Sequence, residues 1–452
     1  MPFKRFKING DRLNSTLQET CTSYGALPAP STGMCRLTLT PSDKAARDWL
    51  VSECKSLGCD IKIDQMGNIF AIRPGTAGNK APIGMGSHMD TQPAGGRYDG
   101  ILGVQSALEV LRTLHENSIQ TYHPIALINW TNEEGARFPG AMMASGVWST
   151  HSSTDLSACH ALRDTDKISM ATALQETGYL GPTPCDYREN NLSAHFELHI
   201  EQGPILERER KEVGIVTSVQ GMKWFAIRVT GREGHSGTTP MEGRADALVT
   251  AARLITAVRD TAVQTGLGVA TVGVISSDTS SQATIPAGVG FVVDVRCDTD
   301  DLVDQLSESI LRAFDQVIKE EDNATTYSVE RTWGLPESKF HPDCIEAVKK
   351  AAVGLYPPRL SPLLANFIQP RQLHASTIMS SPAKRKAEKD ISPPKPKKTK
   401  STTKAKTEIP AYHLTPSRQD ESGENVWPAR KEQIERAREI IRDWYIKTHS
   451  TD

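Results

Sequence analysis

The first two thirds of the chain alternate between short apolar runs and segments with helical periodicity. The runs 81–86 and 123–131 are small or apolar, as buried parallel strands are, and 194–204 is again strand-like. After the first run, apolar residues recur at three- and four-residue steps from Val104 to Leu114, which predicts a helix. Strand followed by helix, repeated along the chain, predicts an α/β fold in which helices cover a central sheet.

Residues 8–57 read as mostly helical, with a loop over 25–33. Ser42 is a candidate N-cap for the second of these helices. Residues 60–64 and 68–73 alternate between apolar and polar positions, which predicts a hairpin with its turn at Met66 and Gly67.

The pattern changes from Met222 onward. Strand, helix, strand, strand, helix and strand follow one another, which is the plan of a split βαβ domain. We expect a second domain over 218–331, inserted into a first domain made of 1–217 and 332–375. The expected elements of the second domain are 223–230, 244–260, 269–276, 289–297, 300–320 and 325–333.

Length, charge and composition limit the number of domains, the partners and the location that we expect for this protein. A length of 452 residues suits two domains, and a net charge of −2 gives no global field toward nucleic acid or membrane. The chain has no apolar run long enough to span a bilayer, and its first residues lack the apolar core of a secretion signal. Its 8 cysteines are scattered without CxxC spacing, which favours reduced thiols and a cytoplasmic protein.

The C-terminal part has a different composition. Residues 376–420 are rich in lysine and poor in large apolar residues, so we expect them to be disordered. The lysine clusters within 384–406 are compatible with a nuclear-import signal or with a solvated tail, and with nucleic acid as a partner only through this tail. Residues 421–452 contain a charged amphipathic helix.

Potential metal ligands follow each of the three apolar runs. His88, Asp90 and Asp99 follow the first, Glu133 and Glu134 follow the second, and His199 lies within the third. The carboxyl ends of parallel strands share one edge of a sheet, where sites are built. The first group alone is equally well read as a Gly-rich turn with a surface and a capping Asp. Three such strand ends together predict a site for a divalent metal such as zinc.

Four motifs carry a family resemblance: GSHMDTQPAGGRYDGILGV, NWTNEEGARFPGAMM, AHFELHIEQGP and GHSGTTPM. They resemble the carbamoylase branch of the dinuclear-zinc amidohydrolase and exopeptidase superfamily. That branch includes N-carbamoyl-amino-acid hydrolases, β-ureidopropionase (β-alanine synthase) and allantoate amidohydrolase, and the fungal-type β-alanine synthase is nearest. The resemblance covers residues from about 8 to about 352. It implies a zinc-exopeptidase-like central sheet with helices on both faces and a ferredoxin-like lid that forms a homodimer.

The resemblance also implies roles at a centre of two divalent ions, which are zinc or, in some members, manganese or cobalt. Asp99 would bridge the ions, and His88, Glu134 and His199 would complete the sites. Asp90 would hold the second nitrogen of His88, and Glu133 would be the general base.

The substrate implied is a small N-carbamoyl amino acid, cleaved to an amino acid, carbon dioxide and ammonia. His235 from the lid would steady the tetrahedral oxyanion, although on the residues alone it reads as an ordinary turn residue. Arg296 would pair with the substrate carboxylate, and Gln202 would bind near the same group.

The chain departs from the family pattern in two places. The family usually has an Asn just before the Ile-Pro that precedes the Arg strand, whereas here Thr284-Ile285-Pro286 follows Ala283. After Ala352 the family's Gly-His-Asp and its late Ser-His, which closes the second metal site, are missing, and so are its last strands. A divergent family member or a C-terminus replaced by unrelated sequence would explain this departure. We expect little or no hydrolase activity of the sequence as written. Two alternatives remain: an inactive relative whose basic tail binds a partner, and a peptidase of the same superfamily.

Overall fold

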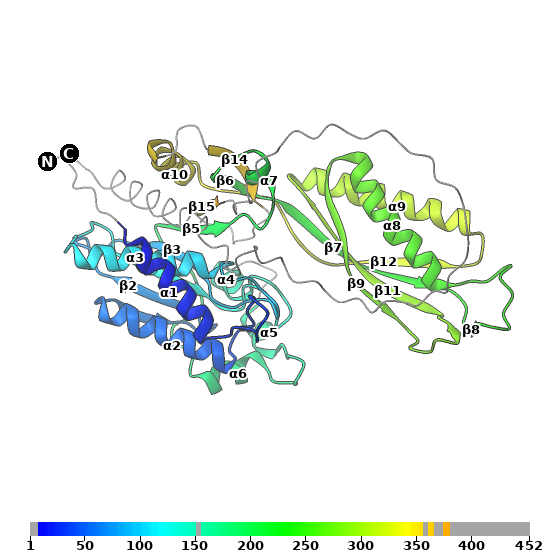
Figure 1. Ribbon diagram of the computed structural model, residues 1–452, viewed down its shortest axis with the longest axis horizontal. Coiled ribbons are helices and arrows are strands. Elements are labelled where there is room, and N and C mark those ends of the chain that lie inside the picture. Colours follow the sequence, from blue (N-terminus) through cyan, green and yellow to red (C-terminus); the bar gives the residue numbers. More distant parts are fainter. Residues whose placement is uncertain (1–7, 151–154, 356–359, 366–373, 380–452) are drawn as a thin grey trace, which may run out of the picture.

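The computed structural model describes residues 8–150, 155–355, 360–365 and 374–379, with side chains as far as residue 352. Two sheets organise these residues (Figure 1). A nine-stranded sheet belongs to the first domain, and a four-stranded sheet belongs to the inserted domain.

The central sheet has the strand order β1-β2-β4-β3-β5-β15-β6-β13, with β14 also paired to β6. The three strands predicted to carry metal ligands are neighbours in it. β3 lies between β4 and β5 and runs parallel to both. The first five strands are β1 (Asp60–Ile63), β2 (Ile69–Arg73), β3 (Ile83–His88), β4 (Ile125–Trp130) and β5 (Ala194–Ile200). The predicted hairpin is β1 with β2.

Helices cover both faces of this sheet, as the resemblance implies. Ile125 and Leu127 of β4 join a core cluster with α2 and α3, whereas Ala126 and Ile128 join a second cluster with α4 and α6. Alternate residues of a strand point to opposite faces, so the two clusters lie on opposite sides. The helices of the first domain are α1 (Gly10–Ser23), α2 (Pro41–Ser56), α3 (Ile101–Glu116), α4 (Met143–Trp148), α5 (Leu156–Ala161), α6 (Met170–Thr177), α7 (Ile205–Arg208) and α10 (Pro342–Leu355).

The start of α2 differs from the prediction. The N-cap is Thr40, whose side chain accepts the N–H of Asp43, and Ser42 lies inside the helix. Pro41 explains the difference, because its fixed φ suits the first helical position and its missing N–H costs nothing there.

The inserted domain has the predicted alternation of strands and helices. Its sheet order is β12-β7-β11-β9, every neighbouring pair is antiparallel, and α8 and α9 cover one face (Figure 1). The elements are β7 (Gly221–Thr230), α8 (Ala247–Thr265), β9 (Gly268–Ser277), β11 (Gly288–Cys297), α9 (Asp300–Glu321) and β12 (Thr326–Leu335), with a small pair of β8 (Gly234–His235) and β10 (Thr284–Ile285).

The inserted sheet begins and ends slightly later than the predicted limits of 218 and 331. Ser218 still belongs to β6 (Val213–Val219) of the central sheet, where it faces Lys339 of β13 (Ser338–Lys339). β12 continues in the inserted sheet to Leu335.

Two late strands correct the expectation that the last strands of the central sheet are missing. β14 (Leu360–Ala365) runs parallel to β6, and β15 (His374–Met379) lies between β5 and β6. β15 crosses the predicted boundary at residue 375. The predictions for the basic segment beyond Met379 and for the helix in 421–452 lie outside the described residues.

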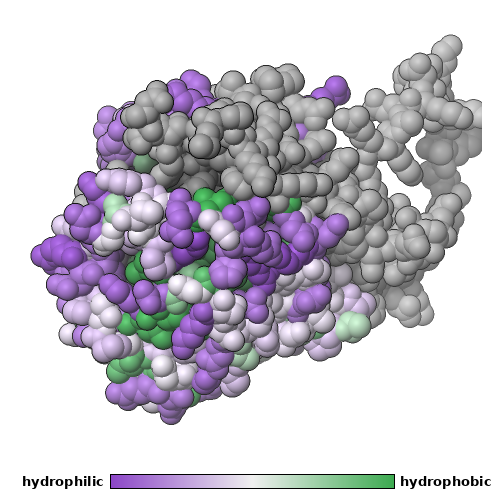
Figure 2. Space-filling view, turned by 90° about the vertical axis from the view of Figure 1, so that its left-hand side faces the viewer, coloured by the Kyte–Doolittle hydropathy of each residue, from purple (hydrophilic) through white to green (hydrophobic). Residues whose placement is uncertain are grey.

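The first-domain end of the molecule presents a mainly hydrophilic surface with scattered hydrophobic areas (Figure 2). Among the helices of the described residues, none combines the length and the apolar character that crossing a bilayer requires.

Candidate metal centre and active site

Three strand ends meet at one edge of the central sheet. His88 is the last residue of β3 and faces Trp130, the last residue of β4. Glu133 follows β4 by three residues, and His199 is the penultimate residue of β5. Parallel strands bring their carboxyl ends together, so segments that are up to 111 residues apart in sequence meet here.

His88, Asp99 and His199 form a group that could hold a metal ion. One ligand atom from each lies within 4.8 Å of the other two. Asp99 Oδ1 is 3.1 Å from His199 Nε2 and 4.0 Å from His88 Nε2. Both imidazoles are almost fully buried, and Asp99 is partly exposed.

The opposite nitrogen of each imidazole is held by a backbone carbonyl. His88 Nδ1 lies 2.9 Å from the carbonyl oxygen of Asp90, and His199 Nδ1 lies 2.9 Å from that of Ile200. A carbonyl oxygen can only accept, so each Nδ1 carries the proton and donates. Each Nε2 faces Asp99, and in the neutral tautomer with the proton on Nδ1 this nitrogen is the one left to bind a metal.

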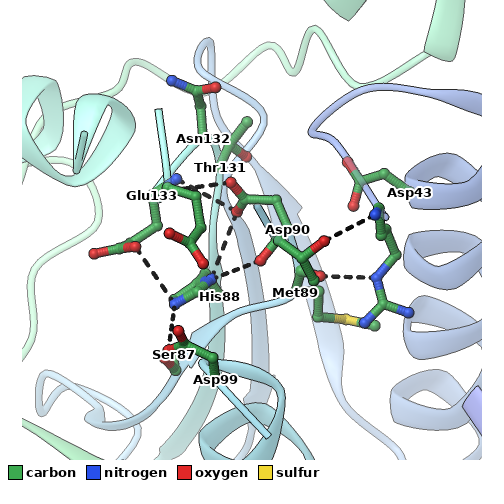
Figure 3. A network of polar contacts seen from close by, with 12 residues as sticks. Asp43, Ser87, His88, Met89, Asp90, Asp99, Thr131, Asn132 and Glu133 are labelled. Atoms are coloured by element: carbon green, nitrogen blue, oxygen red, sulfur yellow. Dashed lines mark hydrogen bonds and ion pairs between the residues drawn. The ribbon is translucent and has the colours of Figure 1, made fainter. Parts of the chain in front are cut away.

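Asp90 supports the site differently from the predicted role. Its backbone oxygen, rather than its carboxylate, holds His88, because the carboxylate is 3.8 Å from Nδ1. The carboxylate instead accepts the backbone N–H groups of Glu133 at 3.3 Å and Glu134 at 3.2 Å (Figure 3). Asp90 therefore ties the end of β3 to the turn after β4.

The two neighbouring glutamates have different partners. Glu133 Oε2 is 3.4 Å from His88 Nε2, whereas Glu134 Oε2 accepts a hydrogen bond from Gln92 at 2.9 Å. Burial raises the pKa of the Glu133 carboxyl to about 8. Burial by itself would lower the pKa of His88, but Glu133 and the other carboxylates around it raise that pKa to about 10.

The charges of this group suit a cation. Four carboxyl groups and two buried imidazoles share one edge of the sheet, and Asp99 faces the Nε2 atoms of both imidazoles. Carboxylate oxygens and imidazole nitrogens are ligands that zinc and similar ions take. The donor set therefore fits a divalent metal. The residues that would hold it are His88, Asp99 and His199.

Two backbone features bring these side chains together. Asn132 has a φ of 55°, and its side-chain amide donates to the carbonyl oxygens of Phe138 and Gly140. This left-handed residue turns the chain so that the glutamates follow β4 directly. Gly100 precedes α3 with a φ of 63°, and a Cβ there would lie 2.3 Å from His88 Nε2.

Gln202 joins the group through Asp99, because its side-chain amide donates to Asp99 Oδ2. Gln92 and Asn132 were not predicted as members of the site. Both lie inside recognised motifs, but their roles depend on a hydrogen bond and a backbone angle that sequence alone does not give.

The two residues expected from the inserted domain lie outside this group. His235 is exposed, and in Figure 1 its strand β8 is at the end of the inserted domain far from β3. Its Nδ1 accepts the N–H of Gly237 at 3.1 Å. Arg296 lies near the other end of the sheet, opposite Met222, and its guanidinium binds Asp294 through two nitrogens.

The position of His374 bears on the missing late ligand. His374 faces His195 across the β5–β15 ladder, whereas the residue facing His199 is Ile378. Four residues along a strand span about 13 Å. His374 therefore sits toward the opposite edge of the sheet from the metal group, and His413 and His449 lie outside the described residues.

Comparison with known proteins places the chain in a family. The family model described as peptidase family M20/M25/M40 matches residues 84–365. The chain therefore belongs to this family. It is similar to the N-carbamoyl-L-amino-acid amidohydrolase of Rhizobium meliloti, with 38% identity over 78% of this chain and 82% of that protein.

Further relatives agree on the class of reaction. The allantoate amidohydrolase of Bacillus subtilis is 32% identical over 65% of this chain and 70% of its own length. The crystal structure of an amidase of the hydantoinase/carbamoylase family from Burkholderia vietnamiensis shares 36% identity and superposes with a TM-score of 0.75, covering 84% of this chain and 91% of that one. These relatives are amidohydrolases that cleave C–N bonds of linear amides, which confirms the predicted class. That the fungal type is nearest stays a prediction.

Proposed function

We propose that the protein hydrolyses the ureido C–N bond of N-carbamoyl amino acids and releases an amino acid, carbon dioxide and ammonia. The observation that carries this proposal is the group of His88, Asp99 and His199 with Glu133 beside it. The similarity to amidohydrolases supports the same substrate class over a peptide or a purely binding role.

The metal we propose is zinc. His88, Asp99 and His199 would hold one ion, and Asp99 with Glu134 would form the protein's part of a second site. A bound divalent ion supplies a water of lowered pKa and polarises the ureido oxygen. The second site is the weaker of the two, because none of the described side chains adds an imidazole to Asp99 and Glu134.

Glu133 is the proposed general base. Its carboxylate faces the ligand side of His88, and burial raises its pKa to about 8, near the value suited to moving a proton at neutral pH. It would take a proton from the attacking water and deliver it to the leaving nitrogen. The carboxylate of Asp90 keeps Glu133 in place by accepting the backbone N–H of Glu133.

Substrate contacts are proposed for Gln202, Arg296 and His235. Gln202 already touches Asp99, so it borders the reacting group. Arg296 would exchange Asp294 for the substrate carboxylate, and its planar fork suits that bidentate pairing. His235 would stabilise the oxyanion of the tetrahedral intermediate. This role requires that the end of an inserted domain that carries His235 come close to a group of His88, Asp99 and His199.

We propose a homodimer in which β9, the outer strand of the inserted sheet, forms the contact. Val269, Val274 and Ile275 of this strand are each more than half exposed, and an open apolar sheet edge is a template for pairing. A cytoplasmic location is supported by the free state of all 8 cysteines.

A substrate panel tests the function. The purified full chain, loaded with Zn²⁺, is assayed for ammonia release from N-carbamoyl-α-amino acids, N-carbamoyl-β-alanine and allantoate, and for release of free amino acids from a dipeptide. Turnover of a carbamoyl amino acid above that of the His199→Ala variant supports the proposal. Turnover of the dipeptide alone would contradict it.

A further inference from the structure

Glu197 is a buried carboxylate that the proposed chemistry does not use. It lies on β5, two residues before His199, with 8% of its surface exposed. Its Oε1 accepts a hydrogen bond from the hydroxyl of Ser87, which is fully buried and directly precedes His88 on β3. One side-chain pair therefore joins the two strands that carry the histidines.

The backbone does not join those strands at this level. β3 and β5 pair at Ile83, Gly84 and Met85, and the ladder ends there. On its other side β3 pairs with β4 as far as His88. If the β3–β5 ladder continued in the same register, His88 would face His199. The strands thus lose their mutual backbone bonds just before the two residues that must share an ion.

The first turn of α3 packs against β3 and β5 at the level of Ser87 and Leu198. A Cβ on Gly103 would lie 2.7 Å from the Cβ of Ser87 and 2.9 Å from the carbonyl oxygen of Leu198. Only a glycine lets the helix approach both strands this closely. Asp99, the third member of the metal group, lies two residues before this helix.

We propose that Glu197 is a positioning residue whose bond to Ser87 sets the separation of His88 and His199. The inference rests on the proposed metal site and goes beyond the ligands themselves. Beyond Met85, where the backbone hydrogen bonds between β3 and β5 end, the Ser87–Glu197 bond holds the two strands together. At this spacing Nε2 of His88 and Nε2 of His199 reach one ion. Partners of this kind typically change metal affinity about 10- to 100-fold.

Three variants test the proposal. Glu197→Ala and Ser87→Ala each remove the bond, whereas Glu197→Gln keeps an acceptor oxygen for the Ser87 hydroxyl. Affinity for Co²⁺ and Zn²⁺ is measured by competition with a chelator on the full chain. We expect about 10- to 100-fold weaker binding for both alanine variants and near-normal binding for Glu197→Gln.

Two further measurements separate positioning from general stability. The visible absorption of bound Co²⁺ reports ligand geometry, and it should change in the alanine variants and not in Glu197→Gln. The thermal midpoint of the metal-free protein reports the fold. If an alanine variant does not fold, the other alanine variant and Glu197→Gln still decide the question.

The outcomes are distinct. Normal affinity and an unchanged Co²⁺ spectrum in a folded alanine variant overturn the proposal, and so does equal weakening in Glu197→Gln, which would make charge rather than the bond responsible. Absence of metal binding in the wild-type chain would instead overturn the proposed function.

Discussion

Asp90 accepts the backbone N–H of Glu133 with its carboxylate while its own carbonyl oxygen accepts from His88. One residue therefore sets the position of a metal ligand and of the proposed base. With 2% of its surface exposed, Asp90 keeps these bonds away from competing water.

The first prediction concerns this link. Asp90→Ala frees the turn that carries the glutamates, and we expect kcat/KM to fall about 10- to 100-fold. Asp90→Asn keeps one acceptor oxygen and should lose less. Steady-state kinetics of the two variants at saturating Zn²⁺ provide the measurement, and unchanged kinetics in Asp90→Ala would contradict the role.

The second prediction assigns the proton transfer. Glu133→Gln keeps the size of the side chain but cannot accept a proton from water, so kcat should fall about 100- to 10,000-fold. Metal content should stay that of the wild type. Glu134→Gln is the matched control, because it should lower the occupancy of the second ion. Loss of all metal in Glu133→Gln would show that this residue is a ligand.

The third prediction uses the register of β15. His374→Ala should leave tightly bound zinc per chain unchanged, because His374 faces His195 and lies about 13 Å along the strand from the level of His199. His199→Ala should lose the tightly bound ion. Metal analysis after dialysis checks both, and zinc loss in His374→Ala would place this histidine at the metal centre.

The fourth prediction concerns the dimer. Val274→Lys with Ile275→Lys places two charges on the exposed edge strand β9, and we expect light scattering to show a shift from dimer to monomer. Met241→Lys changes a side chain that is 78% exposed outside that strand and serves as the control. A doubly charged variant that remains a dimer at the wild-type concentration would place the contact elsewhere.

The fifth prediction is a pH dependence of stability. Burial raises the pKa of Asp64 from its ordinary value near 3.8 to about 6, although Asn68 and backbone N–H groups bind its carboxylate. The folded state then holds this proton more tightly than the unfolded state. The stability that protonated Asp64 contributes is complete at pH values below the pKa of Asp64 in the unfolded state. It is lost as the pH rises through about 6.

Asp64→Asn tests this dependence, because an amide does not titrate. The variant loses hydrogen bonds at every pH, so the slope rather than the absolute stability is informative. Urea unfolding at pH 4.5 and pH 7 should show the wild type losing about 2 kcal/mol relative to the variant over that interval. Parallel profiles would show that the Asp64 pKa is ordinary.

Local patterns predicted the elements that carry the site. The run ending at His88 was recognisable as a strand because it is short and apolar, and the run ending at His199 because it is strand-like; the parallel arrangement brought their ends together. What could not be predicted depends on atoms rather than residue types. The use of the carbonyl oxygen of Asp90, the left-handed Asn132 and the Ser87–Glu197 bond all require the folded backbone.

The late strands β14 and β15 were not predicted, for a different reason. Residues 360–365 and 374–379 lack the family motifs, so nothing in their residue types placed them in the central sheet. Their pairing with β5 and β6 is a tertiary choice that weak local preferences do not reveal.

The place of β15 between β5 and β6 has a consequence for the order of folding. β5 and β6 end by Val219, yet the strand that separates them begins at His374. During synthesis the ribosome must release the whole inserted domain before this gap can close. Contacts so distant in sequence form late, and the open edge of β5 is exposed to other chains in the meantime. Slower or truncated synthesis should therefore favour aggregation of the first domain while the inserted domain, whose strands are contiguous in sequence, folds independently.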